Sequence, residues 1–170
     1  MQVTHATLED ARIVTEIHVF SWQSAYKSIM PAEYLASLSV EGREESWKTC
    51  IVAGTPKLLV AKTNGAIRGW LSFGACRDED STPSGAEVWA LYVSPESWST
   101  GAGRTLWVRA RELMLEQGFK SCSLWVFPQN YRAIKFYQAA GFVRDSSPPK
   151  SFELAGRQLQ EVRYVCQLDA

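Results

Sequence analysis

The chain of 170 residues carries 18 basic residues (Lys and Arg) and 18 acidic residues (Asp and Glu), with 46% hydrophobic and 21% charged residues. Its length suits one domain with a hydrophobic core, so we predict a single domain over residues 1–170. The balanced charge lacks the basic surplus typical of nucleic-acid-binding proteins. No apolar run reaches about 18 residues. We therefore expect neither a nucleic acid nor a membrane as a partner.

The N-terminal residues show no basic-then-apolar signal pattern, which predicts a cytoplasmic protein. The cysteines are widely spaced and form no C-x-x-C pair, which is typical of reduced thiols in that compartment. They are Cys50, Cys76, Cys122 and Cys166. The histidines, His5 and His18, lie near no cysteine pair, so we predict no metal site.

The first third of the chain predicts one short strand followed by three helices. Thr7 opens "TLED", a pattern that resembles a capping box, and apolar residues then recur at helical spacing. The expected elements are a strand at 2–7 and helices at 8–20, 31–39 and 41–52.

Beyond "GTPK" the pattern changes to that of strands. Asn64-Gly65 separates two apolar stretches, 58–63 and 66–76, which is a strong signal for a tight hairpin. A polar loop at 77–85 precedes a further apolar strand, 86–93. These residues therefore predict three consecutive antiparallel strands.

The last part of the chain alternates helices and strands. The expected elements are a helix at 101–117, a strand at 121–127, a helix at 130–140, a short strand from 142 and a last strand at 159–168. The helical crossover makes strands 86–93 and 121–127 parallel neighbours. We therefore predict an α/β fold: a mixed, mostly antiparallel sheet of six to seven strands flanked by helices.

A glycine-containing loop, "WSTGAGR" (98–104), separates the strand at 86–93 from the following helix. Gly101 and Gly103 let the backbone approach a ligand closely, and the helix N-terminus attracts anions such as a pyrophosphate. The loop is neither a Walker A motif nor G-x-G-x-x-G, because Leu106 stands at the third glycine position. Taken alone, the glycines could equally serve a tight turn.

Two longer blocks carry a family resemblance. "EVWALYVSPESWSTGAGRTLW" matches a strand-loop-helix with the signature Q/R-x-x-G-x-G/A, and "LWVFPQNYRAIKFYQAAGF" matches N-x-x-A-x-x-F-Y-x-x-x-G-F. Together with the strand order, they resemble the GNAT superfamily of acetyl-coenzyme A-dependent N-acyltransferases over nearly the whole chain. Trp98 departs from the pattern, because the family often has Gln or Arg there.

The resemblance implies a V-shaped slot, opened by a bulge in strand 86–93, that binds acetyl-coenzyme A as cosubstrate. In the family, strand backbone groups pair with the pantetheine arm and the glycine loop holds the pyrophosphate. The residues implied to bind the coenzyme are Leu91, Tyr92, Val93, Ser99, Thr100, Gly101, Ala102, Gly103, Arg104, Asn130 and Tyr137.

The implied reaction is direct attack of an amine on the thioester in a ternary complex. The amine must lose a proton and the departing thiolate can take one. Glu87 has the family's spacing for a general base, and Tyr137 is the candidate general acid. The alternative is a structural role for each residue: an exposed glutamate at the end of a strand and a tyrosine packed in the core.

The acceptor is expected to be a primary amine of a small molecule or peptide, with Trp22, Tyr26 and Glu87 at its site. The charged run 77–80 reads as a solvated loop or, less commonly, as a gate to the substrate. Alternative functions are a coenzyme A-binding regulatory module, an N-acyltransferase with another acyl donor, and a nucleotide-binding domain. A homodimer is possible by analogy with the family.

Overall fold

The computed structural model describes residues 1–168; residues 169–170, the end of the predicted domain, lie outside this range. The helices are α1 (Ala11–Ala25), α2 (Ala32–Ala36), α3 (Val40–Ala53), α4 (Ala102–Glu116) and α5 (Tyr131–Ala139), with 3-10 turns at Leu8–Asp10 and Pro95–Ser97. The strands are β1 (Gln2–His5), β2 (Lys57–Thr63), β3 (Ala66–Ala75), β4 (Gly85–Val93), β5 (Ser121–Val126), β6 (Val143–Arg144), β7 (Lys150–Leu154) and β8 (Arg157–Gln167).

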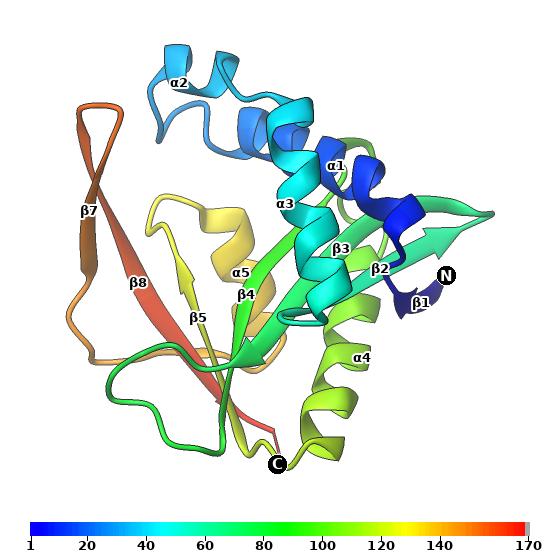
Figure 1. The fold of residues 1–170 in the computed structure, drawn as a ribbon. Coiled ribbons are helices and arrows are strands. Elements are labelled where there is room, and N and C mark those ends of the chain that lie inside the picture. Colours follow the sequence, from blue (N-terminus) through cyan, green and yellow to red (C-terminus); the bar gives the residue numbers. More distant parts are fainter. Residues whose placement is uncertain (169–170) are drawn as a thin grey trace.

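One eight-stranded sheet has the order β1-β2-β3-β4-β5-β8-β6, and β7 pairs with β8 outside this path (Figure 1). All pairs are antiparallel except β4 with β5, as the crossover predicted. The mixed, mostly antiparallel α/β architecture is therefore confirmed. No helix within residues 1–168 is both long and apolar enough to cross a bilayer.

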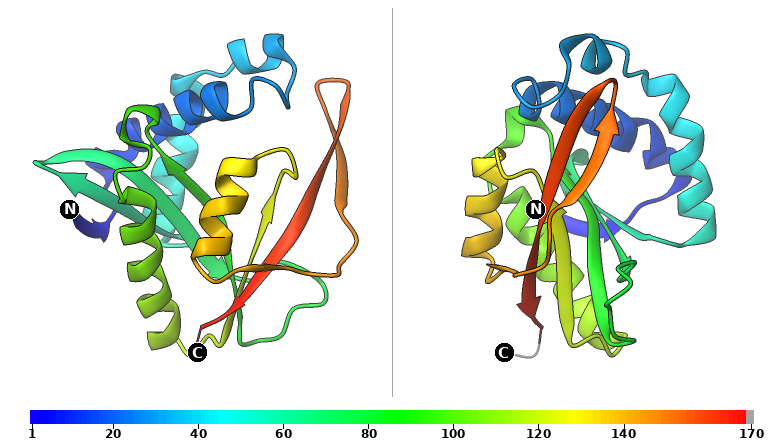
Figure 2. Two further views of the ribbon diagram at one scale, coloured as in Figure 1. Left: turned by 180° about the vertical axis from the view of Figure 1, so that it is seen from behind. Right: turned by 90° about the vertical axis from the view of Figure 1, so that its left-hand side faces the viewer.

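The sheet has helices on both faces: α1 and α3 cover one, and α4 and α5 cover the other (Figure 2). The unbroken apolar run in β2 follows from this double burial. Leu59 belongs to the core cluster beneath α4, whereas Leu58 and Val60 pack with Val14 and Ile17 of α1. Successive residues of the strand thus bury their side chains on opposite faces.

Strand β7 was missing from the six to seven strands that the sequence predicted. Its sequence, "KSFEL", has only two large apolar residues, and its residues are exposed or half-buried. The turn that closes the hairpin with β8 has positive φ at Ala155 (48°) and Gly156 (75°). An Ala-Gly pair is a weak turn signal, whereas Asn64-Gly65, with φ of 51° and 79°, forms the predicted hairpin.

A β-bulge and a limited parallel pairing open the sheet between β4 and β5. The register with β3 pairs Ser72 with Ala90 but Phe73 with Val88, which leaves Trp89 as the extra residue. The parallel pairing of β4 with β5 extends over Gly85–Glu87. Beyond it the two strands diverge toward α1 and α2 (Figures 1 and 2).

Candidate functional site

A cavity of about 520 Å³ lies between the diverging parts of β4 and β5. Its walls come from these two strands, the loop and first turn of α4, the start of α5, the end of α1 and one residue of β8. Most of the predicted coenzyme-binding residues line this one cavity: Leu91, Tyr92, Val93, Ser99, Gly101, Ala102, Gly103, Arg104, Asn130 and Tyr137. Thr100 belongs to the same loop but is not among the lining residues.

The loop before α4 presents unpaired backbone donors. Ser99 and Gly101 have φ of 62° and 93°, the left-handed conformation that occurs in anion-binding backbone turns. The N–H groups of Ser99, Gly101 and residues 102–104 have no acceptor within residues 1–168, whereas Thr100 donates to the carbonyl of Ser97. Free donors at a helix N-terminus form a site for a phosphate or pyrophosphate.

Gly103 brings α4 close to its neighbours. A Cβ at this position would lie 3.4 Å from the ring of Phe136 and 3.7 Å from a methyl carbon of Val93. The glycine therefore allows the first turn of α4 to pack directly against α5 and β4, so that the loop, the strand and the helix meet at one wall of the cavity.

The exposed edge of β4 faces the cavity. Ser94 donates its N–H to the carbonyl of Arg68 on the β3 side, so the alternation of the ladder turns the polar groups of Leu91 and Val93 away from β3. The carbonyl of Val93, however, accepts hydrogen bonds from Trp98 Nε1 at 2.8 Å and Ser21 Oγ at 3.1 Å. A pantetheine arm would therefore find the Val93 N–H and the groups of Leu91, not this carbonyl.

These contacts explain the unusual residue at position 98. The indole of Trp98 bonds back to β4, and the guanidinium of Arg132 stacks over its ring. Trp98 thus connects β4 with the start of α5, and the free backbone donors of the loop lie next to it in the chain.

Helix α5 supplies two polar groups to the cavity. Asn130 caps the helix, because its Oδ1 accepts the N–H of Ala133 at 3.3 Å, and its amide nitrogen has no partner in the described part of the chain. The hydroxyl of Tyr137 likewise has no hydrogen-bond partner among residues 1–168. Burial raises the pKa of Tyr137 well above its ordinary value of 10.0, so the phenol keeps its proton.

Glu87, the predicted general base, does not line this cavity. It is 2% exposed, at the closed end of the slot where β4 pairs with β5, and it is outside the set of described residues that line the cavity. Arg77 holds both carboxylate oxygens through its guanidinium, at 2.5 and 3.0 Å, and its backbone N–H adds a third bond at 3.0 Å. The role of Glu87 as a base stays a prediction, and this geometry favours a structural role.

Replacing Glu87 with Gln should lower the melting temperature by about 4–8 °C, because it breaks the charge-assisted hydrogen bonds between a buried carboxylate and Arg77, worth about 2 kcal/mol. Glu112→Gln is the matched control, since Glu112 forms an exposed pair with Arg109 and should shift the melting temperature little. Calorimetry measures both. Equal shifts in the two variants would contradict a structural role for the Glu87–Arg77 pair.

The wall opposite the loop is aromatic. Tyr26, which ends α1, lines the cavity, and its hydroxyl lies 3.3 Å from that of Tyr92. Its ring makes an edge contact with Phe127, with the ring centroids 5.2 Å apart. Trp22 packs against Tyr26 but is not among the cavity-lining residues. Of the predicted acceptor contacts, Tyr26 is therefore placed at the cavity and Trp22 stands behind it.

His18 lies in the same aromatic cluster. Its ring stacks on Tyr92, and its Nδ1 accepts a hydrogen bond from Trp47 Nε1 at 3.3 Å. Burial, with a smaller contribution from the charge of Arg43, lowers the pKa of His18 to about 4. The imidazole is therefore neutral at pH 7 and serves packing.

Acid should destabilise the fold through His18. The unfolded chain protonates this side chain near pH 6.5, whereas the folded chain keeps it neutral down to about pH 4. The free energy of unfolding thus has its full value above pH 6.5, and it falls by about 3 kcal/mol as the pH drops to 4. Denaturant titrations of His18→Gln should show a flatter acid limb than wild type. His5→Gln, on the exposed end of β1, should keep the wild-type slope, and a wild-type slope in both variants would exclude His18 as the cause.

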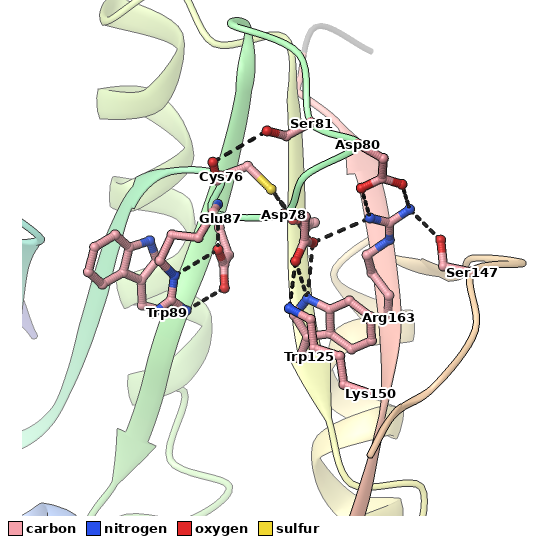
Figure 3. A network of polar contacts seen from close by, with 12 residues as sticks. Cys76, Asp78, Asp80, Ser81, Glu87, Trp89, Trp125, Ser147, Lys150 and Arg163 are labelled. Atoms are coloured by element: carbon pink, nitrogen blue, oxygen red, sulfur yellow. Dashed lines mark hydrogen bonds and ion pairs between the residues drawn. The ribbon is translucent and has the colours of Figure 1, made fainter. Parts of the chain in front are cut away.

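The charged run at 77–80 is more than a solvated loop. Figure 3 shows that Asp78 accepts hydrogen bonds from Trp125 of β5, Lys150 of β7 and Arg163 of β8, and its side chain is 4% exposed. Arg163 also pairs with Asp80. This network fixes the β3–β4 loop to the three strands beyond the slot, and it sets the position of Trp125, which lines the cavity.

Glu161 is a cavity residue that sequence reasoning missed. It stands on β8 in an alternating polar-apolar stretch, where a glutamate looks like part of a solvated face. The structure places it in the cavity wall, half-buried, and burial raises its pKa above its ordinary value of 4.5. Only the pairing of β8 with β5 reveals this position, and that pairing is a long-range contact.

The fold, with a cavity between the diverging strands β4 and β5, is that of the GNAT N-acyltransferases. A model of the Acetyltransferase (GNAT) family matches residues 17–142. YuaI of Bacillus subtilis, an uncharacterized N-acetyltransferase, is 36% identical over 160 residues, covering 94% of this chain and 89% of that protein. The chain therefore belongs to the GNAT acetyltransferase family and is an acyltransferase.

One further relative and two solved structures are similar to this chain over most of its length. A spermidine N(1)-acetyltransferase of Thermoplasma acidophilum is 25% identical over 157 residues, covering 89% of this chain and 94% of that protein. PaiA N-acetyltransferase of the same organism, in complex with coenzyme A, matches with a TM-score of 0.78 at 22% identity, over 98% and 99% of the two chains. YncA of Salmonella typhimurium, with acetyl-CoA, matches with a TM-score of 0.75 at 24% identity, over 100% and 95%.

Proposed function

We propose that the protein transfers an acetyl group from acetyl-coenzyme A to a primary amine of a small molecule or peptide. The observation that carries this proposal is a single cavity with two different ends. One end offers the free N–H groups around Gly101 and the edge of β4, and the other offers an aromatic wall at Tyr26. A donor and an acceptor can therefore occupy the cavity together, which supports direct transfer in a ternary complex.

The donor end suits a coenzyme A ester. The free N–H groups of Ser99 and of residues 101–104 would hold the pyrophosphate, the edge of β4 would pair with the pantetheine arm, and the amide of Asn130 would bond to the same arm. When bound, acetyl-coenzyme A supplies the thioester whose acyl group is transferred.

Tyr137 is the proposed general acid. Tyr137 lines the same cavity and its hydroxyl keeps its proton, so it can protonate the thiolate that leaves when the C–S bond breaks. The N–H of Leu91 points into the slot and can polarise the thioester carbonyl.

A thiol-release assay tests the proposed function. Acetyl-coenzyme A is combined with a panel of alkylamines, amino acids, polyamines, aminoglycosides and peptides, and mass spectrometry identifies any acetylated product. Thiol release that depends on an amine supports the proposal. Calorimetric binding of acetyl-coenzyme A without transfer to any member of the panel would contradict it.

A further inference from the structure

Glu161 is a carboxylate without a hydrogen-bond or ion-pair partner among the described residues, at the proposed acceptor end of the cavity. Its cross-strand neighbour Lys150 instead gives its ammonium to Asp78, at 2.5 Å. The guanidinium of Arg77 is likewise committed to Glu87. The nearest cations are therefore already neutralised, and a half-buried carboxylate without a partner is energetically costly.

The surroundings of Glu161 fit a cation. Leu159, two residues earlier on the same face of β8, packs in the cluster of Tyr26 and Phe127, which places Glu161 beside that aromatic wall. Tyr26, Phe127 and Trp125 line the cavity with it. An ammonium bound here would gain the carboxylate and the faces of aromatic rings, two groups that attract cations in a desolvated site.

We propose that Glu161 binds the ammonium group of the acceptor and takes its proton, and that the acceptor is a primary amine without a carboxylate beside its amino group. The proposal rests on the proposed acetyl transfer and deepens it. The remaining cations of the cavity wall, Arg104 and Arg132, stand at the coenzyme end. An amino acid would thus bring its carboxylate next to Glu161 with no free cation to receive it.

The ammonium gives one proton to Glu161, which passes it to solvent, and the neutral nitrogen forms a bond to the thioester carbonyl carbon. The C–S bond breaks, the sulfur leaves with its electron pair, and it takes the proton of Tyr137. The second proton released from nitrogen as the amide forms restores Tyr137. The products are the N-acetyl amine and coenzyme A, with one proton released.

The charged and titratable groups around Glu161 set its basicity. Burial has the largest effect on its pKa and raises it; Lys150 and Arg77 lower it, and Glu87 raises it. Burial, with a smaller contribution from the charge of Glu161, raises the pKa of both Tyr26 and Tyr92. A carboxylate of raised pKa takes a proton more readily than an exposed one.

The test measures kcat/KM for phenethylamine, n-butylamine and spermidine over a range of pH, in wild type and in Glu161→Gln. We expect Gln to lower kcat/KM about 100-fold or more and to remove the acid-side loss that protonation of Glu161 causes. Glu161→Asp should recover part of the rate. Glu153→Gln, on the exposed strand β7 of the same hairpin, is the control and should keep wild-type values. The calorimetric Kd for acetyl-coenzyme A should be unchanged in all variants.

Phenethylamine and L-phenylalanine form a second matched comparison, because they differ only in the carboxylate. Wild type should prefer phenethylamine by about tenfold or more, the effect of about 1.4 kcal/mol of charge repulsion. Equal use of both would overturn the acceptor class. Wild-type rates and pH dependence in Glu161→Gln, or a parallel loss of acetyl-coenzyme A binding, would overturn the role of Glu161. If wild type transfers acetyl to no amine, the proposed function itself fails and this proposal falls with it.

Discussion

Tyr137→Phe should lower kcat for acetyl transfer about 100- to 1,000-fold and leave the affinity for acetyl-coenzyme A close to that of wild type. The substitution removes one hydroxyl, which has no hydrogen-bond partner within residues 1–168 and whose pKa is raised by burial. The ring keeps its packing against Phe136 and Phe142, at centroid distances of 5.4 and 5.8 Å. The loss therefore falls on proton transfer to the leaving thiolate.

Tyr131→Phe is the control for this change. Tyr131 begins the same helix, α5, but is 74% exposed and lies outside the described cavity wall. Steady-state kinetics with the best amine of the panel, together with calorimetric titration of acetyl-coenzyme A, separates catalysis from binding. A kcat for Tyr137→Phe within about threefold of Tyr131→Phe would remove the phenol from the mechanism.

Local signals in the sequence predicted most of the fold. Asn64-Gly65 defined its hairpin, Gly118 ended the helix before it, and the apolar run at 86–93 marked a strand whose residues are all buried or half-buried. The hairpin of β7 and β8 was missed because its turn is Ala155-Gly156 and its outer strand buries little apolar surface. Elements that depend on a partner strand rather than on their own pattern are the ones that sequence reasoning misses.

The cavity wall that we propose for the coenzyme was equally predictable as a structure, because backbone groups in a local strand-loop-helix build it. The acceptor end of the cavity could not be predicted in this way. Glu87 had the right spacing along the chain, but spacing does not show that Arg77 takes both of its carboxylate oxygens. Glu161 had no local signal, because its place in the cavity arises from pairing between β8 and β5. Whether a carboxylate such as Glu87 or Glu161 is left without a partner therefore depends on side chains from other parts of the sheet.

Gly101→Val should raise the Kd for acetyl-coenzyme A about 10- to 100-fold. Gly101 has φ of 93°, a conformation that costs a β-branched residue about 1–3 kcal/mol. We expect the chain to relieve this strain by rotating the backbone between β4 and α4. That rotation redirects the free N–H groups of Ser99 and residues 101–104, so that they no longer converge on the proposed pyrophosphate position. Calorimetric titration of acetyl-coenzyme A measures the change directly.

Gly118→Val separates this local effect from general destabilisation. Gly118 follows α4 at its other end, with φ of 84°, and a Cβ there would meet no atom within 4 Å, as at Gly101. Both variants should lower the melting temperature by similar amounts, since the strain is the same. Only Gly101→Val should weaken coenzyme binding, because only that glycine aims free donors into the cavity. Equal affinities in the two variants would mean that the loop binds no pyrophosphate, and the donor end would then have to be sought elsewhere along the slot.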